Sequence, residues 1–141
     1  MSFTFKIIEK SDINSIIPLI QKLTENANSD AILKERFAEM ITKNYECAGV
    51  FDGEKLIGVC GMWFQTRHYA GLSMEVDHVY IEAKYQGKGL GKQFFKWLYE
   101  YAKSKGCNIS ELNTYVQNYP SHKFYYNEGY EIYGYHFYKT L

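Results

Sequence analysis

A glycine-rich turn, Gln86-Gly87-Lys88-Gly89-Leu90-Gly91, is the part of this 141-residue chain whose residue types most directly indicate chemistry. It stands between a stretch with the pattern of a β-strand and one with the pattern of an α-helix. Glycines at alternate positions let the backbone approach a ligand closely and point successive N–H groups inward. The helix that follows offers free N–H groups and a positive dipole end, and Lys88 and Lys92 add charge. The turn therefore predicts a cradle for a pyrophosphate group.

The spacing of this turn excludes two common nucleotide motifs. No Gly-Lys-Ser/Thr sequence ends it, so it is not the phosphate loop of ATP-binding folds. Its glycines also do not follow the G-x-G-x-x-G order of dinucleotide-binding folds. The sequence favours a nucleotide other than ATP or NAD, carried on a sheet that is not doubly wound.

Two carboxylates precede the turn, on a stretch from Leu72 to Ile81 that has the pattern of a long strand. Successive side chains of a strand point to opposite faces. Strict alternation therefore predicts one face with Glu75, Asp77, Val79 and Ile81, and the other with Met74, Val76, His78 and Tyr80.

The remaining chemistry-bearing side chains predict neither a metal site nor a thiol nucleophile. The histidines, His68, His78, His122 and His136, show no metal-ligand spacing. The cysteines, Cys47, Cys60 and Cys107, are widely spaced and form no C-x-x-C pair. We expect them to be small core residues that stay reduced.

Hydrophobic periodicity and turn residues predict the order strand, two helices, three strands, helix, strand, helix, and one or two final strands. Pro18 should make the first helix bend or start late, and Asp52-Gly53 should turn a hairpin. This order predicts an α/β (α+β) fold with a mixed, mostly antiparallel central sheet of six to seven strands, flanked by about four helices. We expect strands near 3–8, 47–51, 56–64, 72–81, 109–116 and 131–140, and helices near 13–23, 29–41, 94–106 and 120–128.

Composition places these elements in one domain, residues 1–141, of a cytoplasmic protein. Lys and Arg number 16 and Asp and Glu also 16, so no basic field attracts nucleic acid or an anionic membrane. The N-terminus lacks the layout of a secretory signal, and apolar runs fall far short of the ~20 residues that span a bilayer.

Two motifs in the expected elements resemble those of the GNAT N-acetyltransferase superfamily. The family's turn pattern [RQ]-x-x-G-x-[GA] is matched by Gln86, Gly89 and Gly91. The segment NYPSHKFYYNEGY, residues 118–130, is similar to the second signature, roughly N-x-x-A-x-x-F-Y-x-x-x-G-F. The element order also matches, so the resemblance covers nearly the whole chain. Gln86 stands where arginine is commoner, and Ser121 replaces the usual alanine.

The resemblance implies acetyl-CoA as the acyl donor and co-substrate. The turn would hold the pyrophosphate by backbone amides, and the strand before it would pair its backbone with the pantetheine arm as an extra strand would. Asn118 would bond the pantetheine, and Tyr125 would lie near the thioester sulfur. The implied cofactor-binding residues are Val79, Tyr80, Ile81, Gln86, Gly87, Lys88, Gly89, Leu90, Gly91, Lys92, Asn118 and Tyr125.

Attack by an amine on a thioester needs a neutral amine, a donor for the oxyanion and a proton for the leaving thiolate. From its place in the second motif, Tyr125 is the expected acid. Glu75 and Asp77 are the candidate bases, directly or through water, and Asp77 is favoured because it lies nearer the implied thioester position. The family pattern suggests the main-chain N–H of Val79 as the oxyanion donor.

The leading hypothesis is an N-acetyltransferase that moves an acetyl group from acetyl-CoA to a primary amine by direct attack in a ternary complex. The amine belongs to a small molecule, or to a lysine side chain or peptide terminus. The alternative is a non-catalytic acyl-CoA-binding regulatory module, which has no need of Tyr125 or Asp77. We expect no nucleic-acid or membrane partner, and the sequence leaves open whether the chain is a homodimer.

Tyrosines crowd the C-terminal third of the chain. One interpretation is packing in the sheet and core, since tyrosine suits strands. The sharper one is an aromatic-walled pocket for a cationic amine. These residues are Tyr115, Tyr119, Tyr126, Tyr130, Tyr133, Tyr135 and Tyr138.

Overall fold

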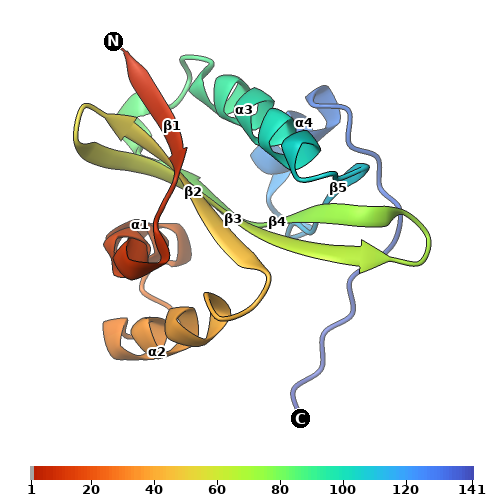
Figure 1. The fold of residues 1–141 in the computed structure, drawn as a ribbon, viewed down its shortest axis with the longest axis horizontal. Coiled ribbons are helices and arrows are strands. Elements are labelled where there is room, and N and C mark those ends of the chain that lie inside the picture. Colours follow the sequence, from red (N-terminus) through yellow and green to blue (C-terminus); the bar gives the residue numbers. More distant parts are fainter. Residues whose placement is uncertain (1) are drawn as a thin grey trace.

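The strands form one sheet with helices on both faces (Figure 1). The computed structural model describes residues 2–141, which contain five strands in the order β1-β2-β3-β4-β5 and four α-helices. The first four strands are antiparallel to their neighbours, and β5 is parallel to β4. The strands are β1 (Phe3–Ile7), β2 (Tyr45–Asp52), β3 (Lys55–Arg67), β4 (Gly71–Ile81) and β5 (Ile109–Leu112). The helices are α1 (Ile17–Thr24), α2 (Asp30–Met40), α3 (Leu90–Ser104) and α4 (Tyr119–Asn127), with 3₁₀ turns η1 (Lys10–Ile16) and η2 (Ala83–Tyr85).

This architecture confirms the predicted α+β class, with a mixed, mostly antiparallel sheet and four helices in residues 2–141. The expected six to seven strands are wrong, because the sheet has five.

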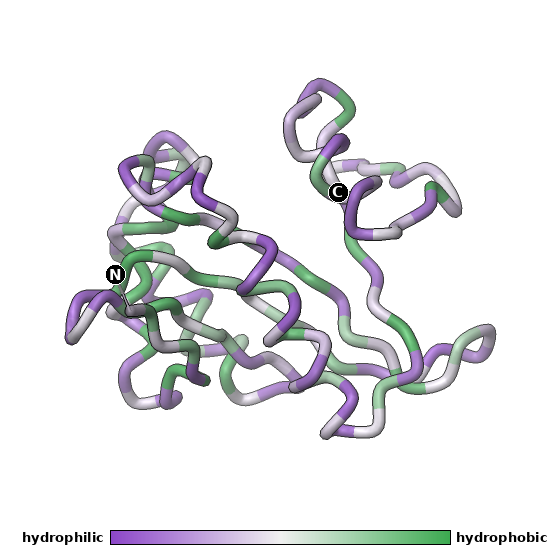
Figure 2. The backbone as a smooth tube through the Cα atoms, turned by 90° about the horizontal axis from the view of Figure 1, so that it is seen from above, coloured by the Kyte–Doolittle hydropathy of each residue, from purple (hydrophilic) through white to green (hydrophobic). Residues whose placement is uncertain are grey.

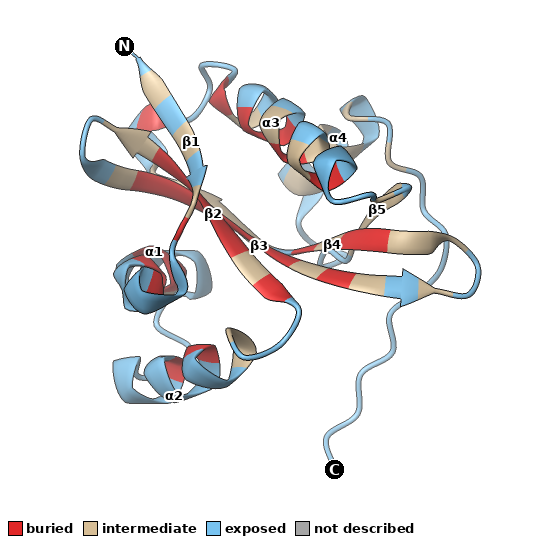
Figure 3. Cartoon of the chain, viewed as in Figure 1, coloured by how far each residue is buried: buried red, intermediate tan, exposed pale blue. Residues whose placement is uncertain are grey.

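Two hydrophobic cores lie on opposite faces of the sheet. On the α3 face, Phe94 and Leu98 of α3 pack against Met62 and Val76. On the α1/α2 face, α1 and α2 pack against the other side of β2 and β3, with Phe37 of α2 fully inside. Figure 3 shows the buried residues along the central strands and on the inner sides of the helices.

Helix boundaries follow local signals in the sequence. Pro18 lies in the first turn of α1 and is preceded by the 3₁₀ turn η1, so the helix starts late as predicted. Ser29 caps α2 by accepting a hydrogen bond from the N–H of Ile32 at 3.2 Å. Gly106, at φ +88°, adopts the left-handed conformation that ends α3.

A bulge in β4 overturns the predicted alternation. Asp77 and His78 stand opposite the single residue Gly61 of β3. The extra residue moves every later side chain to the other face, so Val76 and Val79 both pack on the α3 face. A Cβ on Gly61 would lie 2.2 Å from His78 Nε2, so the glycine makes room for the ring.

The expectation that Glu75, Asp77, Val79 and Ile81 share a face is therefore wrong. Val79 and Ile81 pack on the α3 face, whereas Tyr80 packs on the α1/α2 face. Glu75 and Asp77 face the α1/α2 side, as the contacts of their carboxylates below show.

The final strands predicted at 131–140 do not form. A strand needs a partner for its backbone groups, and after Tyr130 the chain leaves the body and ends beyond it, on the side away from the N-terminus (Figure 1). In the perpendicular view the N- and C-termini also lie well apart from each other (Figure 2). The sheet consequently ends at β5. Each large hydrophobic residue of this segment is at least 72% exposed: Ile132, Tyr133, Tyr135, Phe137, Tyr138 and Leu141.

Candidate active site

The glycine-rich turn joins the end of β4 to the N-terminus of α3 through η2. Gly87 and Gly89 have φ values of +74° and +76°, a conformation that side-chain-bearing residues rarely adopt. Gly89 occupies the N-cap of α3 and carries no side chain that could cap it. The first N–H groups of α3 are therefore available to an anionic ligand, at the positive end of the helix dipole.

Contacts with two distant segments anchor the turn. Lys22 of α1 forms an ion pair with Glu82 at the end of β4, at 2.7 Å, and this hydrogen bond raises the pKa of Lys22. The hydroxyl of Tyr85 donates to Asp52 at 2.5 Å, which ties η2 to the β2–β3 hairpin. These contacts hold the approach to the cradle in one position.

The cradle, the end of β4 and α4 meet at Gly91. A Cβ there would lie 3.5 Å from Phe124 of α4 and 3.9 Å from Ile81 of β4. Gln86, predicted as part of the cradle, uses its side-chain amide to donate to the carbonyl oxygen of Ile81 at 2.7 Å. The glutamine thus stabilises the end of the strand that leads into the turn.

Beside the cradle the sheet opens. β4 pairs with β5 only from Ser73 to Val76, and from Val79 to Ile81 its paired neighbour is β3 alone. Along that stretch, within residues 2–141, the other edge of β4 carries no strand. An extended chain could pair there with the backbone of β4.

A hollow of about 490 Å³ adjoins the cradle on the outer side of α3. Lys92 and Lys96 lie on successive turns of α3, and both side chains bring positive charge to the hollow. Sequence reasoning missed Lys96, although its spacing of four residues from Lys92 was a usable signal. The hollow is lined by Gly89, Lys92, Gln93, Lys96, Tyr99 and Glu128.

Of the two predicted carboxylates, Asp77 has fewer side-chain partners than Glu75. It is exposed, and it accepts a hydrogen bond from Trp63 Nε1 at 2.9 Å. Trp63 packs on the α1/α2 face and stands directly opposite Glu75 in the strand register. Both carboxylates therefore lie on that face.

Glu75 is already engaged. Its carboxylate accepts hydrogen bonds from Gln65 at 3.4 Å and Asn113 at 3.3 Å, and it lies 3.6 Å from the guanidinium of Arg67. The oxygens of Glu75 are therefore occupied by three partners, whereas Asp77 accepts one hydrogen bond, from Trp63.

Tyr125 lies in α4, on the α3 face, with its ring 6.0 Å from that of Phe95 and 5.7 Å from that of Tyr130. Burial raises the pKa of Tyr125 to about 12, so its hydroxyl keeps its proton at neutral pH. Asn118 begins α4, where its side-chain oxygen accepts from the N–H of Ser121 at 3.4 Å. Its side-chain amide group then has N–H donors to spare.

The predicted site residues thus divide between the two faces of the sheet. The carboxylates occupy the α1/α2 face, whereas Tyr125 and the side chains of Val79 and Ile81 occupy the α3 face. The opening between β4 and β5 is the place where groups from both faces can approach one ligand.

Sequence reasoning misplaced His78. It was expected on the side away from the carboxylates, but the bulge turns it to the α1/α2 face, where Nε2 and the Tyr45 hydroxyl share a hydrogen bond of 2.5 Å. Phe37 of α2 packs edge-on against the ring at 5.9 Å. Burial lowers the pKa of His78 to about 4, against the opposing effect of Asp77. His78 is therefore neutral at physiological pH and holds the bulge against α2.

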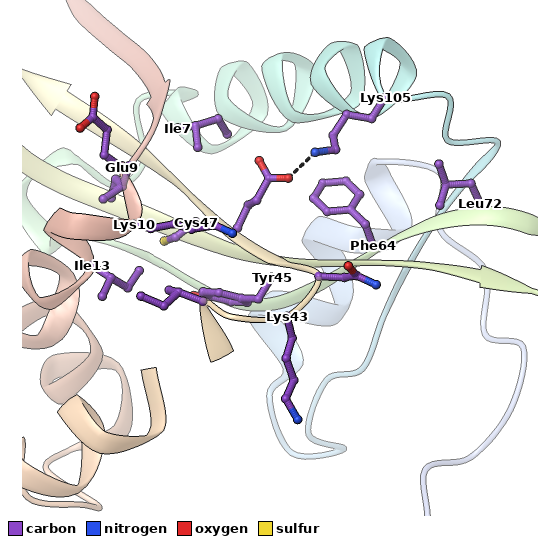
Figure 4. Close-up of a pocket in the computed structure, with 14 residues that line it drawn as sticks. Ile7, Glu9, Lys10, Ile13, Lys43, Tyr45, Cys47, Phe64, Leu72 and Lys105 are labelled. Atoms are coloured by element: carbon purple, nitrogen blue, oxygen red, sulfur yellow. Dashed lines mark hydrogen bonds and ion pairs between the residues drawn. The ribbon is translucent and has the colours of Figure 1, made fainter. Parts of the chain in front are cut away.

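A larger hollow, of about 610 Å³, lies at the other end of the sheet (Figure 4). It arises because β1 pairs with β2 only from Ala48 onward and leaves the start of β2 uncovered. An ion pair between Lys105 and Glu46 lies across it. Its lining includes Phe64 and Tyr45 but none of the predicted site residues.

Within residues 2–141 the three cysteines are free, and no three His, Cys, Asp or Glu side chains come together as a metal site. No helix in that range is long and apolar enough to cross a membrane.

Comparison with known proteins agrees with this geometry. A sequence model of the acetyltransferase (GNAT) family matches residues 13–130. The aminoalkylphosphonate N-acetyltransferase of Salmonella typhimurium is 25% identical over 132 residues, which are 92% of this chain and 86% of that protein. The glucosamine 6-phosphate N-acetyltransferase of Trypanosoma brucei brucei is 25% identical over 120 residues, 82% of each chain. A CoA-bound aminoglycoside N-acetyltransferase superimposes with a TM-score of 0.85 at 14% identity, covering 99% of this chain and 95% of that one.

The chain belongs to the acetyltransferase (GNAT) family, because the family match extends over most of its length. It is an enzyme of the N-acetyltransferase class.

The burial of neutral His78 predicts a pH-dependent stability. A folded-state pKa near 4, below the 6.5 of an exposed histidine, means that only the unfolded chain takes up this proton between pH 6.5 and 4. The stabilising contribution of neutral His78 to the free energy of unfolding is fully present above pH 6.5. It falls as the pH drops, by about 2–4 kcal/mol in total.

Urea unfolding of the wild type and of His78→Gln from pH 4 to pH 7 checks this prediction. The glutamine does not titrate, so its stability should decline less steeply on acidification than that of the wild type. Parallel curves for the two proteins would show that His78 keeps an ordinary pKa.

Proposed function

We propose that residues 1–141 act as one acetyltransferase domain that moves an acetyl group from acetyl-CoA to a primary amine by direct attack in a ternary complex. The observation that carries this proposal is the open edge of β4, which runs into a glycine cradle at the N-terminus of α3. One extended ligand with a pyrophosphate at one end and an amide-rich arm at the other fits that combination. Family membership favours the enzyme over the non-catalytic binding module.

The two parts of the donor site call for different parts of acetyl-CoA. The cradle has the backbone N–H groups, dipole and lysines that a pyrophosphate needs, and the positive hollow beside it offers room for further phosphate. The β4 edge offers the backbone groups that the amides of a pantetheine arm can pair with. The residues proposed to contact acetyl-CoA are Val79, Tyr80, Ile81, Gln86, Gly87, Lys88, Gly89, Leu90, Gly91, Lys92, Asn118 and Tyr125.

The acceptor enters from the α1/α2 face in this proposal. Asp77 takes the proton of the incoming ammonium, directly or through water, and Glu75 contributes negative charge that attracts it. The amine nitrogen then bonds to the thioester carbon, and the N–H of Val79, just after the bulge, donates to the developing oxyanion.

Collapse of the intermediate breaks the C–S bond. The nitrogen still carries one proton more than an amide, and the Tyr125 hydroxyl takes this proton up, directly or through water, as it gives its own proton to the departing thiolate from the α3 face. With a pKa of about 12 it is protonated but a weak acid relative to a thiol near 8.5. Its main contribution is therefore a hydrogen bond that ends in proton transfer only as the thiol leaves.

Small-molecule amines are the favoured acceptors over lysine or peptide amines. Relatives that match more than two thirds of this chain are named for small amines: aminoalkylphosphonate, glucosamine 6-phosphate and thialysine. Incubating the protein with acetyl-CoA and a panel of primary amines, with free thiol as the readout, tests the proposal. Absence of amine-dependent thiol release across a panel that includes those three classes would oppose it.

The cradle predicts that charge at Gly89 abolishes CoA binding. Gly89→Glu places a side chain where φ is +76°, and its carboxylate repels the pyrophosphate. No heavy atom lies within 4 Å of the new Cβ, so the fold should survive. Calorimetry should show no CoA binding.

Gly106→Glu is the matched control for this variant. Gly106 has φ +88° and follows the opposite end of the 15-residue α3, about 22 Å away, so the strain and charge change are the same. It should bind CoA as the wild type does. Equal binding by Gly89→Glu would place the cradle elsewhere.

Tyr125→Phe should lower kcat by about 10²-fold, the lower end of the range for general acid catalysis, because a thiolate is a fair leaving group. The ring contacts remain, so CoA affinity should be nearly unchanged. Steady-state kinetics combined with calorimetry separates the two effects. Tyr126→Phe, an exposed neighbour, is the control and should change neither value.

Asp77→Asn should lower kcat/KM most at neutral pH, and alkaline pH should partly restore it, because the amine then arrives already neutral. Glu75→Gln should have a smaller effect, since Glu75 is engaged by Arg67 and Asn113. The measurement is a pH–rate profile for the three proteins with one good amine. A profile of Asp77→Asn parallel to the wild type at every pH would assign the base to another group.

A further inference from the structure

The two residues of the β4 bulge are each held by an aromatic side chain from another strand of the sheet. Trp63 of β3 donates from its indole Nε1 to the carboxylate of Asp77 at 2.9 Å. Tyr45 of β2 shares a hydrogen bond of 2.5 Å with His78 Nε2. A bulge leaves its extra residue outside the regular ladder, so these side-chain contacts fix an orientation that backbone pairing does not.

Trp63 is itself supported from below. In the strand register it stands between Tyr45 of β2 and Glu75 of β4, and its ring packs against that of Tyr45 with the centroids 5.2 Å apart. Tyr45 is only 1% exposed, whereas Trp63 is partly exposed beside the exposed Asp77. The indole thus rests on a buried ring and presents surface that a ligand next to Asp77 can reach.

We propose that Trp63 is a positioning and recognition residue of the acceptor site, an inference that rests on the proposed function. Its indole N–H fixes one oxygen of Asp77, and the second oxygen of this exposed carboxylate receives the ammonium group of the acceptor. The indole ring beside that oxygen binds the same ammonium by a cation–π contact. The favoured acceptor is therefore an alkylamine, which arrives charged at neutral pH.

The ring and the N–H of the indole act at different stages of the reaction. An ammonium that donates to Asp77 stands roughly 2.8 Å from the carboxylate oxygen. Cation–π attraction acts within about 6 Å of a ring centroid, so the indole that bonds to the same carboxylate can contribute to it. The ring consequently increases the affinity for the charged amine, whereas the N–H keeps Asp77 where it can take the proton.

Single-turnover kinetics with saturating acetyl-CoA and one good amine separates these two effects. Trp63→Phe keeps a ring but loses the N–H, so the maximal rate of acetyl transfer should fall about tenfold, because an unanchored carboxylate is often out of place. The amine concentration that gives half of this rate should change by less than about twofold, since a ring remains. In Trp63→Leu, which lacks both groups, that concentration should also rise about threefold.

Trp97→Phe is the matched control for these variants. Trp97 lies in α3 on the opposite face of the sheet, where its ring packs near Phe5 of β1. This substitution should change neither the rate nor the amine concentration. Circular dichroism of all the variants checks that the fold is retained.

A double-variant cycle shows whether Trp63 acts through Asp77. If it does, adding Trp63→Phe to Asp77→Asn should not lower the rate further, because the carboxylate that the N–H positions is already absent. A merely structural role of Trp63 would cause its own loss in both backgrounds. Additive losses, or an undiminished rate for Trp63→Phe alone, would overturn the proposal.

Fluorescence tests the position of the amine without any acetyl transfer. The chain has two tryptophans, so the Trp97→Phe variant reports on Trp63 alone and the Trp63→Phe variant on Trp97 alone. With CoA in place of acetyl-CoA no acetyl group is available, and titration with the same amine should change the emission of Trp63 to a saturating value. Trp97 should give no amine-dependent change. An unchanged emission of Trp63 would show that the amine binds elsewhere and would also overturn the proposal.

The outcomes for the wild type separate this inference from the proposed function. A wild type that acetylates the amine no faster than Trp63→Phe does would keep the transfer reaction and lose only the role of Trp63. A wild type that releases no thiol with any amine of the panel would lose both.

Discussion

Gly61 and the His78 ring that lies over it hold a bulge in β4, and the arrangement of the site depends on it. Because two residues of β4 face one residue of β3, Asp77 stays on the same side as Glu75, whereas Val79 and Ile81 turn toward α3. A regular strand would place all four side chains on one face. The bulge thus places the two carboxylates on the face opposite to the Val79 and Ile81 side chains of the strand end that leads into the cradle.

The opening between β4 and β5 has a benefit and a cost. The parallel pairing of the two strands ends at Val76, which leaves β4 backbone groups free for a ligand beside the N-terminus of α3. The short β5 in turn forms the edge of the sheet, and open edges invite pairing with another chain. The same interruption of the sheet therefore leaves both the end of β4 and the outer side of β5 without a neighbouring strand in residues 2–141.

The sequence by itself determined what depends on a few adjacent residues. The glycine turn, the Ser29 cap, the late start of α1 at Pro18 and the hairpin at Gly53 were all predictable, because each reflects a local backbone preference. The two motifs around Gly89 and Tyr125 were enough to place the chain in its family.

Only the tertiary structure decided what depends on pairing between distant segments. The bulge at Asp77 is set by its register with β3, and no local pattern in residues 72–81 distinguishes it from regular alternation. The segment after Tyr130 has a strand's sequence yet forms no strand, because a strand exists only with a partner for its backbone groups. The sequence alone therefore could not predict which face of the sheet each site residue occupies, or how many strands the sheet contains. Both depend on which distant segments pair in the folded chain.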